Sequence, residues 1–319
     1  MIDFETERKR LENLPPIKDA NIVWLVPDSC SWDCAQRART PNLDAIGSKR
    51  EAWTLAPYTP AAHAAMWAGH FPSTRGGDNL PFYHEPTKQM FRIVTAPDRD
   101  ANKGCGILLA GTSVIDGFRK IDFHVQCVGG VSQFSDGSWL RTGFPWSDSI
   151  YFGPNLNEEQ MKPREPKEFP LTHVDEIMKR IPRTGPFLLS LNAQETHYCY
   201  DSGLGIPDDI QKVLPTLGKV LNLRSTRTDP DTMRAKEILE PFAERFRQMQ
   251  VDALEIFDTR VGSLLEAVKI RGGDRPTIVI AHGDHGENFG DMFEGQKVWG
   301  HLHQSRECMT VPLWIGELK

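Results

Sequence analysis

Long hydrophobic runs are missing from this sequence, and no apolar stretch approaches the roughly 20 residues that a membrane-spanning helix requires. The N-terminal segment MIDFETERKRLENLPP is charged but has no apolar segment behind it, so it does not resemble a secretory signal. We therefore expect a cytoplasmic protein with no membrane partner.

Paired cysteines are also absent, because none of the six forms a CxxC motif and no short secreted framework surrounds them. We expect reduced thiols, and a zinc ribbon is excluded. Any metal must then be held by Asp, Glu, His or a hydroxyl oxygen. The six are Cys30, Cys34, Cys105, Cys127, Cys199 and Cys308.

No block of one charge is present either: 37 Lys and Arg face 43 Asp and Glu, for a formal net charge of −6. This balance argues against a polyanion-binding surface, so we expect no nucleic-acid partner. With 319 residues, 39% of them hydrophobic, the chain can bury a large core. We favour a single α/β domain over 1–319 rather than two domains, and the oligomeric state stays open.

Four short apolar runs are typical of strands buried on both faces. Helical patterns lie between them, the last of which is broken near Pro241. This alternation predicts a mainly parallel central sheet with helices on both faces. The strands are expected at 22–26, 187–191, 277–281 and 311–315, and the helices at 60–68, 171–181 and 232–270.

Two less regular stretches are expected to be loop-rich insertions, at about 76–168 and 202–247. The first is interpreted as loops and short strands over one end of the sheet. The second includes a basic, Gly- and Pro-containing part at 202–231 that we expect to be a mobile excursion. Neither pattern identifies a substrate.

Polar side chains follow three of the predicted strands, at the sheet edge where α/β proteins bind ligands. Asp28 follows the first strand, Glu195 and His197 follow the second, and Asp284 and His285 follow the third. An Asp-His pair suits Zn²⁺ or Mn²⁺ better than Ca²⁺. An isolated Asp-His-Gly tripeptide would favour a solvated loop, and it is the neighbouring motifs that favour a metal site.

Thr59 lies at the predicted start of a helix, with Pro60 at its first position and Gly69 at its exit. It either caps the helix or supplies a hydroxyl where amide groups and the dipole favour an anion. A neighbouring metal would make that hydroxyl a nucleophile. His63, one turn later, either faces the anion or packs inside.

Taken in order, these motifs resemble the alkaline phosphatase, sulfatase and nucleotide pyrophosphatase superfamily, which implies an alkaline-phosphatase-like fold. By this resemblance Asp28, Thr59, Asp284 and His285 are metal ligands, Thr59 is also the nucleophile, and Asp258 is structural. The motifs are the strand ending at Asp28, Thr40-Pro-Asn-Leu-Asp44, Thr59 ten residues before Gly69-His-Phe-Pro72, Asp284-His285-Gly286-Glu287 and Val311-Pro-Leu.

The departures from this pattern favour one branch. Sulfatases carry a Cys or Ser that matures to formylglycine, and they usually have two adjacent aspartates where this chain has Asp28-Ser29. The resemblance therefore implies a metal-dependent hydrolase or transferase that acts on a small anionic phosphate or phosphonate ester through a phosphothreonine intermediate. A sulfatase-like hydrolase and a non-catalytic anion- or metal-binding relative remain the alternatives.

A second metal is less well supported, because two-zinc relatives have Asp-x-x-x-His where this chain has Glu195-Thr-His197. The stretch from Asp284 to His301 resembles threonine-dependent phosphoethanolamine transferases, which implies one strong metal site. We expect one tightly bound Zn or Mn. Glu195, His197 and His301 are candidates for a weak second metal or for acid, base and supporting roles, with His197 and His301 counted as catalytic candidates.

Overall fold

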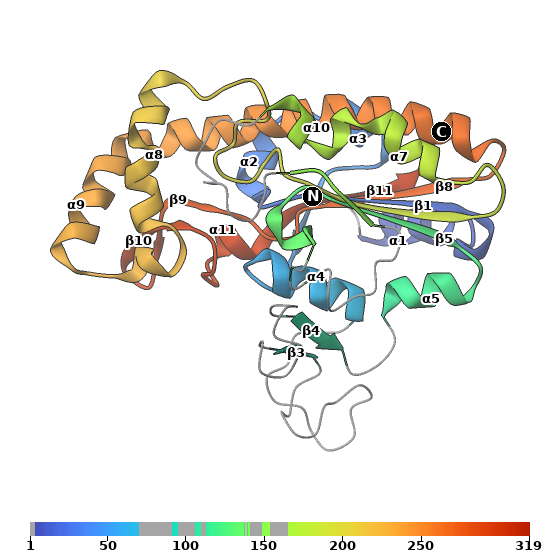
Figure 1. Cartoon of the computed structure of the whole chain (residues 1–319), viewed down its shortest axis with the longest axis horizontal. Coiled ribbons are helices and arrows are strands. Elements are labelled where there is room, and N and C mark those ends of the chain that lie inside the picture. Colours follow the sequence, from blue (N-terminus) through green and yellow to red (C-terminus); the bar gives the residue numbers. More distant parts are fainter. Residues whose placement is uncertain are drawn as a thin grey trace, which may run out of the picture.

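The computed structural model describes residues 4–69, 91–94, 106–109, 113–136, 138, 140, 149–153 and 165–319. Its centre is a seven-stranded sheet in which β1 lies between β7 and β8 (Figure 1). The strands β8, β1, β7, β5 and β6 are parallel, and β11 is antiparallel to both β8 and β2. In sheet order the strands are β2 (Arg50–Trp53), β11 (Thr310–Glu317), β8 (Thr277–His282), β1 (Asn21–Pro27), β7 (Phe187–Ala193), β5 (His124–Gly129) and β6 (Ser149–Tyr151).

The central strands form where the sequence has continuous apolar runs. In β1 six of seven residues are buried, and every residue of β7 is buried. Leu25 of β1 pairs with Leu191 on one side and Ala281 on the other. The predicted mainly parallel sheet is confirmed, and all four predicted runs are strands.

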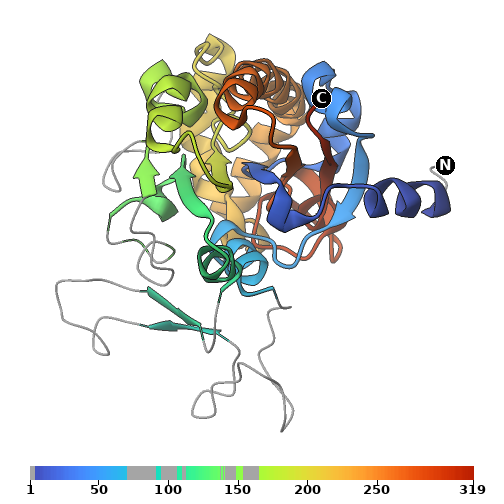
Figure 2. The same ribbon diagram turned by 90° about the vertical axis from the view of Figure 1, so that its right-hand side faces the viewer.

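Helices cover both faces of the sheet, as predicted (Figure 1). Two buried clusters follow the alternation of side chains along β1, because Val23 and Leu25 belong to one and Ile22 to the other. One face carries α2 (Trp32–Arg37), α3 (Pro41–Ile46), α7 (Val174–Arg180) and α10 (Ala243–Gly272), and the other carries α4 (Thr59–Ala68) and α5 (Val114–Lys120). Helix α1 (Phe4–Glu12) projects from the edge of the domain (Figure 2).

The helix boundaries refine the predictions. The predicted 171–181 helix begins as a 3-10 turn, Pro170–Thr172, before α7. The predicted break near Pro241 is confirmed, since α9 (Pro230–Leu239) is separated from α10 by the 3-10 turn Glu240–Phe242.

Both expected insertions contain more regular structure than the sequence indicates. The 76–168 stretch supplies β5, β6 and α5, together with a small hairpin of β3 (Phe91–Val94) and β4 (Gly106–Leu109), and the rest of it largely falls outside the described residues.

The expected mobile excursion at 202–231 is instead built around α8 (Asp208–Val220). Helix α8 forms because its apolar side chains recur at helical spacing and become buried, and it packs against α9. Beside these helices lies a hairpin of β9 (Asn288–Phe293) and β10 (Gln296–Gly300) (Figure 1). The buried α8 positions are Ile210, Val213, Leu214, Leu217 and Val220.

Five cysteines lie among the described residues, and all five are buried and free of disulfides. Within the same residues, no helix has the length and apolar character needed to span a lipid bilayer.

Candidate active site

The loops after β1 and β8 meet beyond the carboxyl ends of these two strands. Asp28 follows β1 directly, and its backbone N–H donates to the Ala193 carbonyl at the end of β7 (2.8 Å). Gly283 follows β8, and a Cβ at this position would lie 2.7 Å from the Cys30 carbonyl oxygen. Only a glycine therefore lets the two loops approach closely enough to bring Asp28 and Asp284 together.

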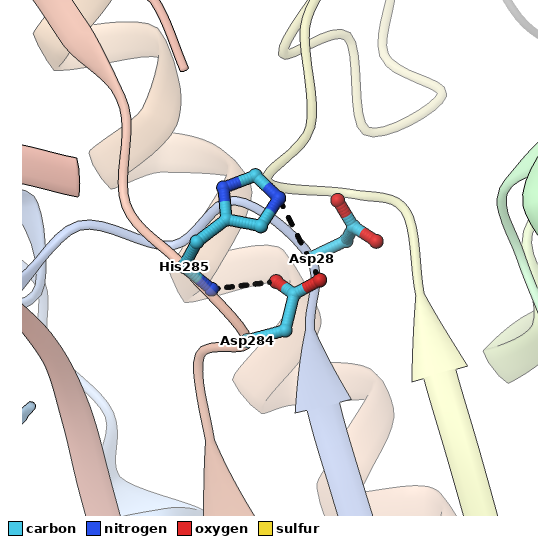
Figure 3. Close-up of side chains that lie close together, drawn as sticks. All are labelled: Asp28, Asp284 and His285. Atoms are coloured by element: carbon cyan, nitrogen blue, oxygen red, sulfur yellow. Dashed lines mark hydrogen bonds and ion pairs between the residues drawn. The ribbon is translucent and has the colours of Figure 1, made fainter. Parts of the chain in front are cut away.

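Asp28, Asp284 and His285 form a fully buried cluster whose ligand atoms all lie within 4.8 Å of one another. Figure 3 shows the two carboxylates and the imidazole converging from these two loops. His285 Nδ1 lies 2.9 Å from the Gly286 carbonyl oxygen and donates to it, so Nε2 keeps its lone pair. Asp284 Oδ2 is buried and accepts no hydrogen bond within the described part of the chain.

The electrostatics of the cluster also fit a cation. Burial, followed by repulsion from Asp28, raises the pKa of Asp284 well above its usual value. Burial lowers the pKa of His285 to about 3, which keeps the imidazole neutral and able to coordinate. Two buried carboxylates beside a neutral imidazole are an oxygen and nitrogen donor set for Zn²⁺ or Mn²⁺.

Thr59 opens α4 beside this cluster. Its Oγ1 lies 3.4 Å from each carboxylate oxygen of Asp28 and 3.2 Å from His285 Nε2. The expected N-cap role is wrong, because Tyr58 is the N-cap residue, Thr59 is the first helical residue, and no side chain caps the helix. The hydroxyl is thus aimed at the cluster and not at the helix backbone. Gly69 ends α4 in a left-handed conformation, as expected, and residues 70–72 lie outside the described part.

His63 packs within the domain and also contacts the site. Its Nδ1 lies 3.2 Å from the Thr59 carbonyl oxygen and 3.5 Å from Asp284 Oδ2, and its ring packs against Trp67 and Phe134. Burial lowers its pKa to about 3, so it is neutral. Of the two alternatives for His63, the ring contacts with Trp67 and Phe134 fit the packed role.

His197 and His301 approach the cluster from separate segments. The His301 ring is 4.7 Å from that of His285 and 5.9 Å from that of His197, measured between centroids. His197 Nε2 lies 3.9 Å from Asp28 Oδ1. His197 Nδ1 lies 2.9 Å from the Tyr198 carbonyl oxygen. His301 Nδ1 lies 3.2 Å from Glu287 Oε1. Each histidine is therefore held in orientation by its Nδ1.

Glu195 forms a buried ion pair with Arg260 of α10. Its Oε1 accepts from Arg260 Nη1 (3.0 Å), and Arg260 Nη2 donates to the Ser202 carbonyl (2.7 Å). Glu195 is completely buried, and the arginine lies over the Phe169 ring. This contact gives Glu195 a structural partner from α10.

We expect Arg260→Met to destabilise the fold without changing metal binding. Removing the arginine strands the buried Glu195 carboxylate, and breaking a buried ion pair typically costs about 3–5 kcal/mol. Urea unfolding of Arg260→Met measures this loss, and elemental analysis of Arg260→Met and of Glu195→Gln measures the metal content. A lower metal content in Glu195→Gln would instead assign Glu195 as a ligand.

Two residues at the site carry no sequence signal that points to them. Asn192 Nδ2 donates to Asp28 Oδ2 (2.8 Å), and the Gln250 side chain contacts the loops that follow β1 and β7.

Asp258 fits its expected structural role, because its carboxylate accepts from the Asn42 and Leu43 N–H groups at the start of α3. His282 accepts from Trp24 Nε1 (2.7 Å) and is structural as well.

No protein-family model matches the chain, and no curated protein matches it in sequence. Among solved structures, the chain shares its fold with a periplasmic EptC domain and with a sulfatase. It is similar to the C-terminal periplasmic domain of EptC from Escherichia coli in complex with Zn, with TM-score 0.54 and 14% identity over 96% of this chain and 77% of that one. It is also similar to BT1596, a 2-O GAG sulfatase, with TM-score 0.53 and 16% identity over 93% and 64%.

The expected cytoplasmic location is contradicted by these comparisons, because the matched Escherichia coli domain is periplasmic, both with zinc and in a second structure. The sequence argument failed because the absence of an apolar segment from these residues does not determine the compartment in which the protein works.

Proposed function

We propose that this protein is a metal-dependent hydrolase or transferase of a small phosphate or phosphonate ester, with Thr59 as the nucleophile. The observation that carries this proposal is the position of Thr59 Oγ1, 3.2–3.4 Å from atoms of Asp28 and His285 at the N-terminus of α4. The hydroxyl is directed toward the cluster, and the helical backbone of α4 fixes the position of the Thr59 side chain.

Asp28, Asp284 and His285 would hold one divalent metal, Zn or Mn, with Thr59 as the fourth ligand. When bound, such an ion lowers the pKa of a coordinated hydroxyl and neutralises charge on phosphoryl oxygens. The similarity to a domain solved with Zn supports the choice of a divalent metal.

Residues of the chain supply the nucleophile, a binding position for the phosphoryl group and the proton transfers. Thr59 Oγ1 gives its proton to His197 or His301 and forms a bond to phosphorus while the bond to the leaving oxygen breaks. The α4 N-terminus favours the anionic phosphoryl group. That histidine passes the proton to the leaving oxygen. It later takes a proton from water or another acceptor hydroxyl, whose attack on phosphothreonine frees Thr59, and it returns this proton to Thr59 Oγ1.

The test is a panel of phosphate monoesters, diesters, phosphonates and sulfate esters, assayed with the metal-free protein and after addition of Zn²⁺ or Mn²⁺. We expect metal-dependent turnover of at least one phosphorus ester and, after rapid acid quenching, a phosphorylated peptide containing Thr59. Turnover of sulfate esters alone would support the sulfatase alternative, which the similarity to BT1596 keeps in view. Metal binding with no turnover would support the non-catalytic alternative.

Replacement of His197 or His301 by Gln is expected to slow turnover by about 10²–10⁴-fold, the usual contribution of a positioned proton-transfer group. Metal content should stay at one per chain, because neither residue belongs to the three-residue cluster. Steady-state kinetics and elemental analysis check this, with His173→Gln as the control, since the His173 ring stacks on Phe152. A fall from two metals to one in either variant would instead reveal a second metal.

A further inference from the structure

Gln250 is a fully buried amide on α10 and uses all of its hydrogen-bonding capacity. Its Oε1 accepts from the N–H (3.2 Å) and the hydroxyl (2.9 Å) of Ser31. Its Nε2 donates to the carbonyls of Ser29 (2.9 Å) and Thr196 (3.0 Å). One side chain thus joins the loop after β1 to the loop after β7.

The Ser29 contact bears directly on the cluster. Ser29 adopts a left-handed conformation with φ 60°, which is unfavourable for a residue with a Cβ. In that conformation its N–H donates to Asp284 Oδ1 (3.0 Å) and its hydroxyl donates to Asp28 Oδ1 (3.1 Å). The Gln250 amide holds the Ser29 carbonyl and so supports the turn that orients both carboxylates.

The Thr196 contact bears on the other side of the site. The Thr196 hydroxyl donates to the Asp28 carbonyl (2.6 Å), and the next residue is His197. Gln250 therefore fixes the spacing between Asp28 and His197, although none of the contacts recorded for it involves the three cluster residues.

We propose that Gln250 is a positioning residue that sets the geometry of Asp28, Asp284 and His197 through Ser29, Ser31 and Thr196. Its effect on turnover rests on the proposed function, whereas its effect on the cluster does not. Loss of supporting hydrogen bonds around metal ligands typically lowers metal affinity or activity by about 10–100-fold.

The decisive variants are Gln250→Met, which keeps the length but removes all four hydrogen bonds, and Gln250→Glu, which keeps the acceptor oxygen but replaces the NH₂ donor group. The control is Gln248→Met, two residues earlier on α10, where the amide contacts Asp252 and Arg37 at the surface. For each variant we would measure Zn²⁺ affinity, kcat and KM on the best panel substrate, and a crystal structure.

We expect Gln250→Met to lower Zn²⁺ affinity and kcat by about 10–100-fold with little change in KM, because orientation and not substrate contact is lost. Gln250→Glu should lie between it and the wild type, and the control should be unchanged. The crystal structures should show Ser29 leaving its left-handed turn and its bond to Asp284 broken. If Gln250→Met does not fold, Gln250→Glu carries the same comparison.

A variant that loses thermal stability but keeps wild-type metal affinity, kcat and the Ser29–Asp284 bond would overturn the proposal. If the wild type turns over no substrate, the proposed function fails on its own. The Zn²⁺ affinities and the crystal structures still decide the role of Gln250 in that case, and unchanged cluster geometry in Gln250→Met overturns it.

Discussion

Thr59→Ala is expected to abolish turnover, with a loss of at least about 10³-fold, because it removes the oxygen that bonds to phosphorus. The fold should be nearly unaffected. The Thr59 side chain does not cap α4, so only a small buried group is lost, at a cost of about 1 kcal/mol. Single-turnover kinetics and acid-quench mass spectrometry of the Thr59 peptide measure the loss.

Two companion variants make this result specific. Thr59→Ser keeps the hydroxyl and should retain part of the activity, whereas Thr259→Val alters a threonine on α10 whose hydroxyl donates to the Glu255 carbonyl and should leave turnover unchanged. Near wild-type activity of Thr59→Ala toward every substrate would show that another nucleophile carries the reaction.

Asp284→Asn is expected to remove the metal and, with it, turnover. The change preserves shape but replaces a buried anionic ligand by a neutral amide. Loss of an outer supporting group already lowers affinity by about 10–100-fold, and loss of a ligand should exceed that range. Elemental analysis after dialysis against buffered Zn²⁺ checks the outcome, and chelation of the wild type should reproduce the loss of activity.

The same variant has an opposite effect on stability. Without metal, Asp284 is buried beside Asp28, so its charge opposes folding. Asp284→Asn should therefore melt at a higher temperature than the wild type when both are kept in a chelator, and Asp252→Asn on the exposed surface of α10 should melt like the wild type. Undiminished zinc content in Asp284→Asn would exclude Asp284 as a ligand.

The sequence predicted those strands that consist of continuous apolar runs. The apolar runs of β1 and β7 identified central strands because burial on both faces favours apolar residues at most positions. Strand β5 was missed because His124 and Gln126 interrupt its pattern, although Gln126 is buried and its amide donates to the Cys127 carbonyl. Strand β6 has only three residues, too few to show a period.

The grouping of Asp28 and Asp284 could be predicted from the sequence, because parallel strands end at one edge of the sheet whatever their separation along the chain. The supporting contacts were not accessible. The sequence does not show that Glu195 forms an ion pair with Arg260, which lies 65 positions later in the chain. In the sequence Gln250 is one of several polar residues of a long helix, and nothing there shows that it is buried or that it contacts the loops.

The central position of β1 has a consequence for how the chain acquires its structure. Its neighbours β7 and β8 lie more than 150 positions further along the chain, so the middle of the sheet consists of contacts between distant segments. Such topologies fold slowly, since a long loop must close before its contacts form. During synthesis β1 would emerge before β7 and β8, with apolar faces and unpaired edges, and it would stay prone to aggregation until β8 is made.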